Sequence, residues 1–151
     1  MSSPGATALF IDTGAFYARF KPDDENHEQA VELFDGIRSG KYTYRPLYTS
    51  RYVLSELATL LLRWVGHGDA VRALSAIRES ESFIVLPVDA GAFDRTCKEF
   101  ARYDDQQISF VDHSSAVLAN EYDIEHLFAF DSDFRTLDFT IVPGDTGEIH
   151  E

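Results

Sequence analysis

Cysteine is almost absent from this sequence. Cys97 is the only cysteine among 151 residues, so the chain cannot form an internal disulfide bond. No group of cysteines and histidines has zinc-site spacing, and a chain of this length can build a core without such cross-links. These absences are typical of a protein from a reducing compartment, and we expect a cytoplasmic location.

Long apolar runs are also missing. No segment is long and apolar enough to cross a bilayer, and the first residues lack the basic and apolar regions of a targeting signal. We therefore expect no leader and no association with a membrane. No repeat, low-complexity tract or linker divides the chain, which predicts a single domain over residues 1–151 with an acidic tail from about residue 144.

Positive charge is scarce. The chain has 13 lysines and arginines against 26 aspartates and glutamates, which gives a formal net charge of −13. Such a chain repels polyanions unless positive charge gathers locally or a cation intervenes, so a binder that relies on a basic patch is disfavoured. Acids are spread over the whole chain and only three of the cations are lysines. This halophile-like composition suggests a salt-adapted host.

Hydrophobic patterning predicts strands that alternate with helices. Short apolar runs predict strands at 9–11, 47–49, 83–86, 127–130 and 139–142, and apolar residues at helical spacing predict helices between them. This alternation predicts an α/β fold with a mainly parallel sheet that is covered by helices.

We expect one apolar stripe of each helix to face the core. The expected stripes are Val53, Leu57, Leu60, Leu61 and Trp64 after the cap at Ser50; Phe93, Cys97 and Phe100 after the cap at Asp89; and Val111, Ser115, Leu118 and Tyr122 on the helix that begins at Ser109. On the outer face of the second of these helices we expect ion pairs Asp94–Lys98 and Arg95–Glu99.

Four acidic residues stand where a predicted strand ends or a predicted helix begins. Asp12 directly follows the first strand, and Asp131 follows the fourth. Glu56 borders the apolar stripe of its helix without a cation three or four residues away, and Asp112 lies in the first turn after Ser109. Because the carboxyl ends of parallel strands share one edge of a sheet, we expect the four side chains to converge there.

Each of these acids also has an ordinary structural explanation. An Asp before a helix caps its free N–H groups, acids are common in turns, and Ser109 with Asp112 fits a capping box. A calcium-binding loop after the fourth strand is excluded, because its further ligands and its glycine are missing. The convergence of all four acids, and not any single one, predicts a site.

Four motifs in this order resemble the PIN domain, and within that family the toxin nucleases of the VapBC type. The motifs are Ile11-Asp12-Thr13, Ser55-Glu56-Leu57, Val111-Asp112 with Ala116 and Ala119, and Ala129-Phe130-Asp131-Ser132-Asp133-Phe134. They cover almost the whole chain. One departure is Gly14, where such toxins often carry a serine, and this weakens any claim about a second hydroxyl in the site.

The resemblance implies a three-layer α/β/α sandwich that forms a homodimer and, with Mg²⁺ or Mn²⁺, cleaves RNA as the toxin partner of an antitoxin protein. Asp12, Glu56, Asp112 and Asp131 would be the catalytic, metal-binding acids, and Asp133 is an extra candidate ligand. Carboxylate oxygens suit these hard cations, which would also supply the positive charge that the chain lacks. Thr13 stands at the family's hydroxyl position and is a candidate for binding substrate.

Other residues give weaker indications. Arg51 belongs to a group of tyrosines and arginines between residues 42 and 52 that could stack on bases and hold phosphates, although packing or a partner interface explains the group better. His113 beside Asp112 is a candidate general base, but we expect it on the surface. We expect Cys97 in the core.

Alternative functions stay open on the sequence alone. A haloacid-type phosphatase needs a second Asp where Gly14 stands, and none of the lysines is placed for a receiver domain. A PIN nuclease that processes ribosomal RNA, and a PIN-fold module that binds RNA or protein without cleaving it, are both compatible with the motifs.

Overall fold

Strands and helices alternate along the chain in a computed structural model that describes residues 5–149. The strands are β1 (Thr7–Ile11), β2 (Tyr44–Ser50), β3 (Phe83–Leu86), β4 (His126–Phe128) and β5 (Thr140–Val142). The helices are α1 (Thr13–Phe20), α2 (His27–Ser39), α3 (Arg51–Trp64), α4 (His67–Glu79), α5 (Ala90–Arg102), α6 (Phe110–Glu121) and α7 (Asp133–Thr136). Residues 1–4, where we expect no leader, and 150–151 of the acidic tail lie outside the described residues.

The five strands form one parallel sheet in the order β3-β2-β1-β4-β5. The chain first adds β2 and β3 on one side of β1, and then crosses over to add β4 and β5 on the other side. The order therefore reverses between β1 and β4. In open parallel sheets, the crevice at the carboxyl ends of such a pair is where ligands bind.

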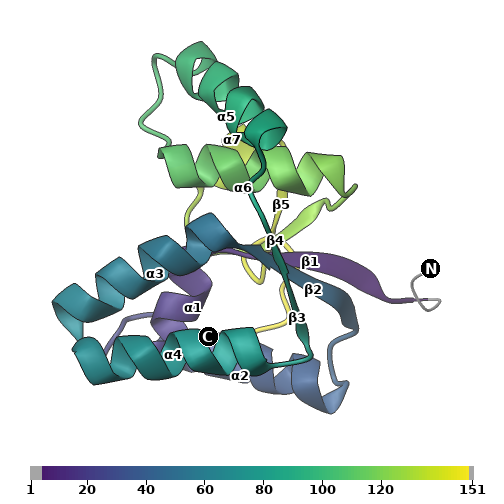
Figure 1. Cartoon of the computed structure of the whole chain (residues 1–151). Coiled ribbons are helices and arrows are strands. Elements are labelled where there is room, and N and C mark those ends of the chain that lie inside the picture. The colour runs from purple at the N-terminus through teal and green to yellow at the C-terminus, as the bar shows by residue number, and fades with distance from the viewer. Residues whose placement is uncertain (1–4, 150–151) are drawn as a thin grey trace.

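Helices cover both faces of this sheet, so the fold is the predicted three-layer α/β/α sandwich (Figure 1). Helices α1 to α4 lie on one side, and α5 and α6 lie on the other. Aromatic residues fill the core between the sheet and the first group of helices. The ring of Phe34 lies 5.7 Å from that of Phe16 and 4.9 Å from that of Phe128.

None of the helices within residues 5–149 combines the length and the apolarity that a bilayer span requires.

Side chains cap three helices at the predicted residues. Ser50 accepts a hydrogen bond from the N–H of Val53, Asp89 from that of Ala92, and Ser109 from that of Asp112. A side-chain cap of this kind satisfies an N–H group that the helix itself leaves unpaired. These caps fix where α3, α5 and α6 begin.

The apolar stripe predicted to be buried on α5 instead faces outward. Phe93 and Phe100 are 42% and 49% exposed, and Cys97 is exposed as well. Helix α5 packs against α6 through the buried side chains of Ala92 and Thr96. Small side chains allow the two helices to approach closely. Within residues 5–149, the ring contacts of Phe93 and Phe100 are only with Phe110 at the start of α6 and, for Phe100, with His113, so nearly half of each side chain stays exposed.

Other burial predictions were wrong for similar reasons. Trp64, at the last position of α3, is 58% exposed, and Tyr122, just after α6, is 47% exposed. Helix α6 is buried on nearly all sides from Asp112 to Ala119, because it has a covered face toward α5 as well as toward the sheet. Strand β3 lies at an edge of the sheet, so Ile84 is also exposed.

The ion pair predicted between Arg95 and Glu99 does not form. Arg95 pairs with Glu121 on the neighbouring helix α6, and Glu99 pairs with Arg102 at 3.5 Å. No pair between Asp94 and Lys98 is present among the ion pairs of the described residues. The Arg95–Glu121 contact instead ties α5 to α6.

Candidate active site

Asp12 lies where β1 ends and α1 begins, at the central position of the sheet. Its backbone N–H donates to the carbonyl of Phe128 at the end of β4, with an N to O distance of 3.0 Å. Its side chain accepts a hydrogen bond from the N–H of Gly14 at 3.4 Å. These contacts fix the position of Asp12, which is 4% exposed, beside the carboxyl ends of β1 and β4.

Asp112 lies in the first turn of α6, and its position follows from the cap of that helix. The Ser109 hydroxyl oxygen accepts a hydrogen bond from the Asp112 N–H at 3.1 Å. Asp112 is 7% exposed. The Ser109 side-chain cap predicted from the sequence is therefore formed, and it places the Asp112 carboxylate at the sheet edge instead of in open solvent.

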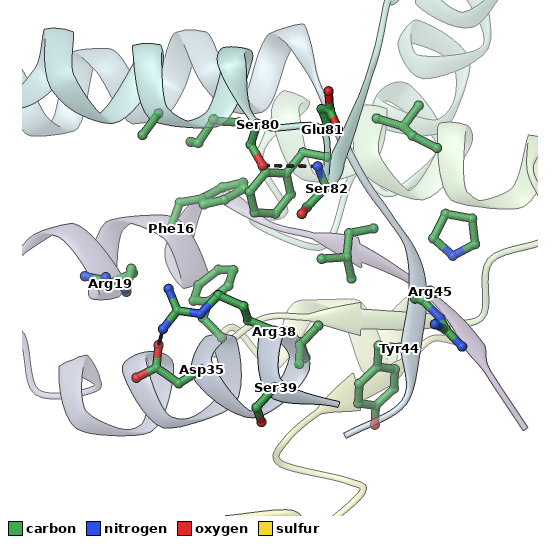
Figure 2. Close-up of a pocket in the computed structure, with 18 of the residues that line it drawn as sticks. Phe16, Arg19, Asp35, Arg38, Ser39, Tyr44, Arg45, Ser80, Glu81 and Ser82 are labelled. Carbon is green, nitrogen blue, oxygen red and sulfur yellow. Dashed lines mark hydrogen bonds and ion pairs between the residues drawn. The ribbon is translucent and has the colours of Figure 1, made fainter. Parts of the chain in front are cut away.

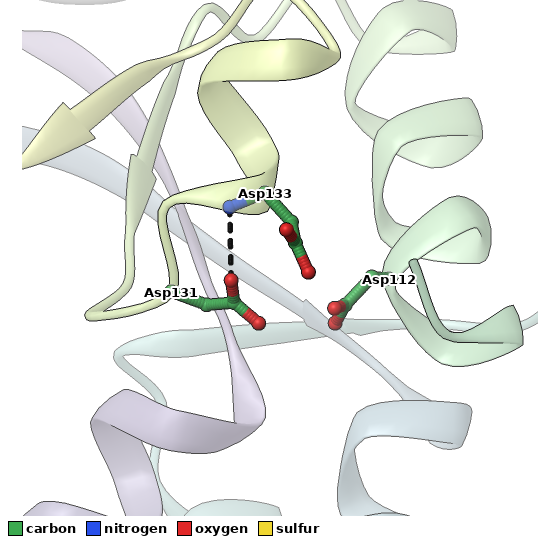
Figure 3. A group of neighbouring side chains, drawn as sticks. All are labelled: Asp112, Asp131 and Asp133. Atoms are coloured by element: carbon green, nitrogen blue, oxygen red, sulfur yellow. Dashed lines mark hydrogen bonds between the residues drawn. The ribbon is translucent and has the colours of Figure 1, made fainter. Parts of the chain in front are cut away.

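Asp131 and Asp133 follow β4, in the loop that leads into α7. The Asp131 carboxylate accepts a hydrogen bond from the N–H of Asp133 at 2.8 Å, which shapes this loop. Figure 3 shows both side chains pointing toward Asp112 on α6. Carboxylate oxygens of Asp112, Asp131 and Asp133 lie within 4.8 Å of one another. Asp133, only an extra candidate on the sequence, thus belongs to the tightest group of acids.

The pKa values indicate that the four acids of the sequence prediction share one region. The pKa of Asp12 is raised to about 7, mainly by burial and to a smaller extent by the negative charges of Glu56 and Asp131. Burial raises the pKa of Asp112 to about 8, followed in importance by the charges of Asp12, Asp131 and Glu56. Like charges at short range disfavour simultaneous ionisation. Asp12 and Glu56 thus lie near enough to Asp112 and Asp131 for their charges to interact, whereas the group of oxygens within 4.8 Å contains Asp112, Asp131 and Asp133.

The cluster also has the features of a site for a divalent cation. Asp12 Oδ1 and Thr13 Oγ1 are buried, and neither has a hydrogen-bond partner within the described part of the chain. None of the ion pairs among residues 5–149 involves the clustered acids. A buried carboxylate without a partner is costly, and a hard cation that takes oxygen ligands would supply one. The donor set thus fits Mg²⁺ or Mn²⁺.

Two residues that the sequence predicts to bind substrate, Thr13 and Arg51, differ in their exposure to solvent. Thr13 is buried at the start of α1, next to Asp12. Arg51 is exposed at the first position of α3, the helix that also holds Glu56. The structure thus leaves Arg51 accessible to a substrate, whereas Thr13 is almost fully buried beside Asp12.

His113 is buried, and the prediction of a surface position was wrong. Its side chain is 1% exposed and packs against the rings of Phe100 and Tyr103, with centroid distances of 6.0 and 5.3 Å. Burial lowers its pKa. The sequence around His113 could not show this, because residues 112–115 are polar, as on a surface helix, and yet all four are buried in the fold.

A larger pocket of about 940 Å³ lies away from the acids, beside the amino-terminal ends of β2 and β3 (Figure 2). Its floor includes Phe16 and Phe83, and its rim includes Arg19 and Arg45. The acids follow the carboxyl ends of β1 and β4, at the opposite edge of the sheet. This pocket is therefore not the candidate active site.

Comparison with known proteins gives one consistent result. The sequence pattern that defines the PIN domain matches residues 9–140. The chain is 33% identical to the 23S rRNA-specific endonuclease VapC20 of Mycobacterium tuberculosis over 136 residues, which cover 89% of this chain and 97% of the relative.

Solved structures agree with this match. The crystal structure of VapC20, described as a sarcin–ricin loop cleaving toxin, has a TM-score of 0.79 and 32% identity, and the match covers 87% of this chain and 96% of that one. VapBC2 from Rickettsia felis, bound to a DNA fragment from its promoter, has a TM-score of 0.62 at 12% identity and covers 89% of this chain and 97% of that one. The second likeness supports the fold alone.

Proposed function

This chain belongs to the PIN-domain family, and from that premise we propose that it is a divalent-metal-dependent endoribonuclease, the toxin of a VapBC-type toxin–antitoxin pair. The main support is the acidic crevice at the carboxyl ends of β1 and β4, where a buried oxygen of Asp12 has no partner within the described residues. A crevice at this reversal of strand order is where an α/β fold places its chemistry.

We assign catalytic and metal-binding roles to Asp12, Glu56, Asp112 and Asp131, and a metal-binding role to Asp133. A divalent ion held by these carboxylates would supply the positive charge that attracts a phosphate and activates a water for attack on phosphorus. The chain's own part is to hold the carboxylates in place. The Gly14 N–H orients Asp12, Ser109 positions the turn that carries Asp112, and the Asp133 N–H orients Asp131.

We propose ribosomal RNA as the substrate. Similarity to a 23S rRNA-specific endonuclease over nearly the full length of both chains supports this assignment. The buried, unpartnered oxygens favour a metal-loaded nuclease over a PIN-fold module that only binds RNA, because such a module gains nothing from the cost of clustered acids. Cleavage of intact ribosomes at one bond distinguishes a toxin from a nuclease that trims precursor RNA.

We propose that the protein works in the cytoplasm as a homodimer and that an antitoxin protein inhibits it. The similarity to VapC20, which is described as a toxin, supports an antitoxin partner. The outward apolar stripe of α5, which consists of Phe93, Cys97 and Phe100, supports self-association, because apolar residues gain stability when a second copy covers them. Thr13 and Arg51 are proposed to contact the RNA.

Cleavage of ribosomal RNA by the purified protein tests the proposal. We expect cleavage with Mn²⁺ or Mg²⁺, none with chelator, and none from Asp12→Asn or Asp112→Asn protein that remains folded. Asp94→Asn, an acid on the exposed side of α5, is the matched control and should cleave normally. Metal-independent cleavage, or full activity in both site variants, refutes the proposed function.

Growth of a host cell tests the toxin assignment separately. Expression of the chain without a partner should slow growth, and the same Asn variants should relieve the effect. Equal toxicity of the native chain and the variants argues against RNA cleavage as its cause.

A further inference from the structure

A pocket of about 570 Å³ lies between α3 and the start of α6, directly beside the acidic residues. Glu56 forms part of its wall, and the charge of Glu56 also acts on Asp12 and Asp112. The other lining residues are Tyr52, Ser55, Thr59, Leu60, Phe110 and Val111. A molecule bound at the acids therefore has this pocket as its immediate neighbour.

Two of the seven lining residues, Tyr52 and Phe110, are aromatic, and Glu56 is the only charged one. The rings of Tyr52 and Phe110 lie with centroids 6.4 Å apart and planes 35° apart. Ser55 and Thr59 place hydroxyl groups beside these rings. A pocket with a carboxylate and no cation does not attract a phosphate. Flat apolar surfaces bordered by hydroxyl groups suit the face and the edges of a nucleobase.

Phe110 is supported from its other side. The rings of Phe93 and Phe100 on α5 lie 5.5 and 5.6 Å from it. Aromatic contacts of this kind hold a ring in a preferred orientation. Phe110 is therefore a fixed wall of the pocket, and a base that entered would not have to pay for ordering it.

We propose that this pocket binds an unpaired base of the RNA substrate, next to the phosphate that is cleaved. The inference rests on the proposed function, because it assigns the neighbouring acids to the scissile phosphate. The phosphate of the nucleotide then lies at the cation held by the acids, and its neutral base lies in the adjacent apolar pocket. The pocket would select bonds that are flanked by a base already free of its stack, as in a loop, since extruding a stacked base costs free energy.

A second protein chain is the other occupant that an apolar pocket could accept. Glu56 argues against it, because a dry protein interface would bury the Glu56 carboxylate without a cationic partner from this chain. Such a cover would also close one side of the crevice through which RNA must enter. An RNA base leaves Glu56 beside the phosphate and its cation.

Substitution of Tyr52 tests the role of the ring. Tyr52→Ala should lower kcat/KM for RNA cleavage by roughly 5- to 100-fold, the range that base–aromatic stacking supplies. Tyr52→Phe keeps the ring and should retain activity, whereas Tyr52→Leu keeps bulk without an aromatic face and should not. Trp64→Ala, which removes an exposed ring at the far end of the same helix, is the matched control and should stay within about twofold of the native protein.

An RNA that lacks one base tests the contact itself. Removal of the base beside the cleaved bond should lower kcat/KM of the native protein by about the same factor as the Tyr52→Ala substitution does. The same abasic substrate should cause no further loss of kcat/KM in Tyr52→Ala protein. As a binding measurement, 2-aminopurine at that position should be quenched by Asp112→Asn protein and remain bright with the Asp112→Asn/Tyr52→Ala protein.

Three outcomes overturn the inference: unchanged kcat/KM in Tyr52→Ala, an equal abasic penalty in both proteins, or a loss of activity that follows dissociation of a dimer in sedimentation. The last outcome would identify the pocket as a protein interface. Absence of any cleavage by the native protein instead refutes the proposed function, so the two failures are distinguishable.

Discussion

Asp12 at the end of β1 and Asp112 in the first turn of α6 lie close enough for the charge of Asp12 to raise the pKa of Asp112. Both side chains are buried, and burial contributes more to the raised pKa of each than any neighbouring charge does. The folded chain without a cation therefore favours their protonated forms. This relationship leads to a prediction about stability.

We predict that the metal-free protein loses stability as the pH rises from 5 to 8.5. A carboxyl whose pKa is about 7 or 8 when folded, against 3.8 ordinarily, binds a proton more tightly in the folded state. Stability from such a group is fully present below pH 4 and is lost as the pH rises through the folded pKa. Thermal melting of native and Asp112→Asn protein across this pH range measures the loss. The free energy of unfolding of the native protein should fall by on the order of 1–4 kcal/mol more than that of the variant.

Divalent cation should reverse that loss. Mn²⁺ at pH 8 should raise the melting temperature of the native protein, because a ligand that binds only the folded state stabilises it by mass action. The Asp112→Asn protein should show a much smaller rise. Two results together would contradict this account of the acids. The difference in stability between native and Asp112→Asn protein would not vary with pH, and Mn²⁺ would raise both melting temperatures equally.

Asp133→Asn should raise the Mn²⁺ concentration needed for half-maximal cleavage. Asp133 oxygens lie within 4.8 Å of those of Asp112 and Asp131, so loss of its charge weakens the attraction for a cation. We expect a shift of roughly 10- to 100-fold, the range seen when residues that support a metal ligand are replaced. Asp138→Asn, an exposed acid two residues after the end of α7, is the control. An unchanged metal requirement would exclude Asp133 from the site.

Ser109→Ala should lower both stability and activity. The substitution removes the acceptor for the Asp112 N–H, and loss of such a cap costs about 1 kcal/mol, or roughly 2–4 °C in melting temperature for a chain of this size. Asp89→Ala removes the equivalent cap of α5, which holds none of the acids, and is the matched control. Equal activity in the two variants would show that the cap of α6 does not position Asp112.

Phe93→Ser with Phe100→Ser should convert the protein from dimer to monomer in sedimentation experiments. These two side chains are the large exposed residues of the α5 stripe, and serine removes the apolar surface that a second copy would cover. Val71→Ser, an exposed apolar position on α4, is the control and should leave the mass unchanged. A native protein that is monomeric at micromolar concentration would contradict the proposed homodimer.

The sequence was sufficient to predict the architecture and the order of the acids. Apolar runs that end at Asp12 and shortly before Asp131, and a capping box at Ser109, depend on local chemistry that a sequence displays directly. The parallel arrangement follows from strict alternation of strands and helices. Predicting these features does not require knowing which helices pack against each other.

Predictions that depend on helix partners were the ones that were wrong. Phe93 and Phe100 form a regular apolar stripe, but the residues that α5 buries against α6 are the smaller Ala92 and Thr96, and the two rings contact α6 only at their edge. His113 is buried because α6 is covered on two sides. Likewise, the closeness of Asp133 to Asp112 depends on the loop after β4, whose shape is set by a side-chain hydrogen bond that spacing alone does not reveal.

An anomalous difference map from a crystal soaked in Mn²⁺ tests the central claim most directly. We predict a peak in the crevice between β1 and β4, within coordination distance of Asp12, Asp112 and Asp131 oxygens and shared with Asp133 or Glu56. A map without a peak there at saturating Mn²⁺, with the carboxylates paired to arginine or lysine side chains instead, would contradict the metal-dependent nuclease.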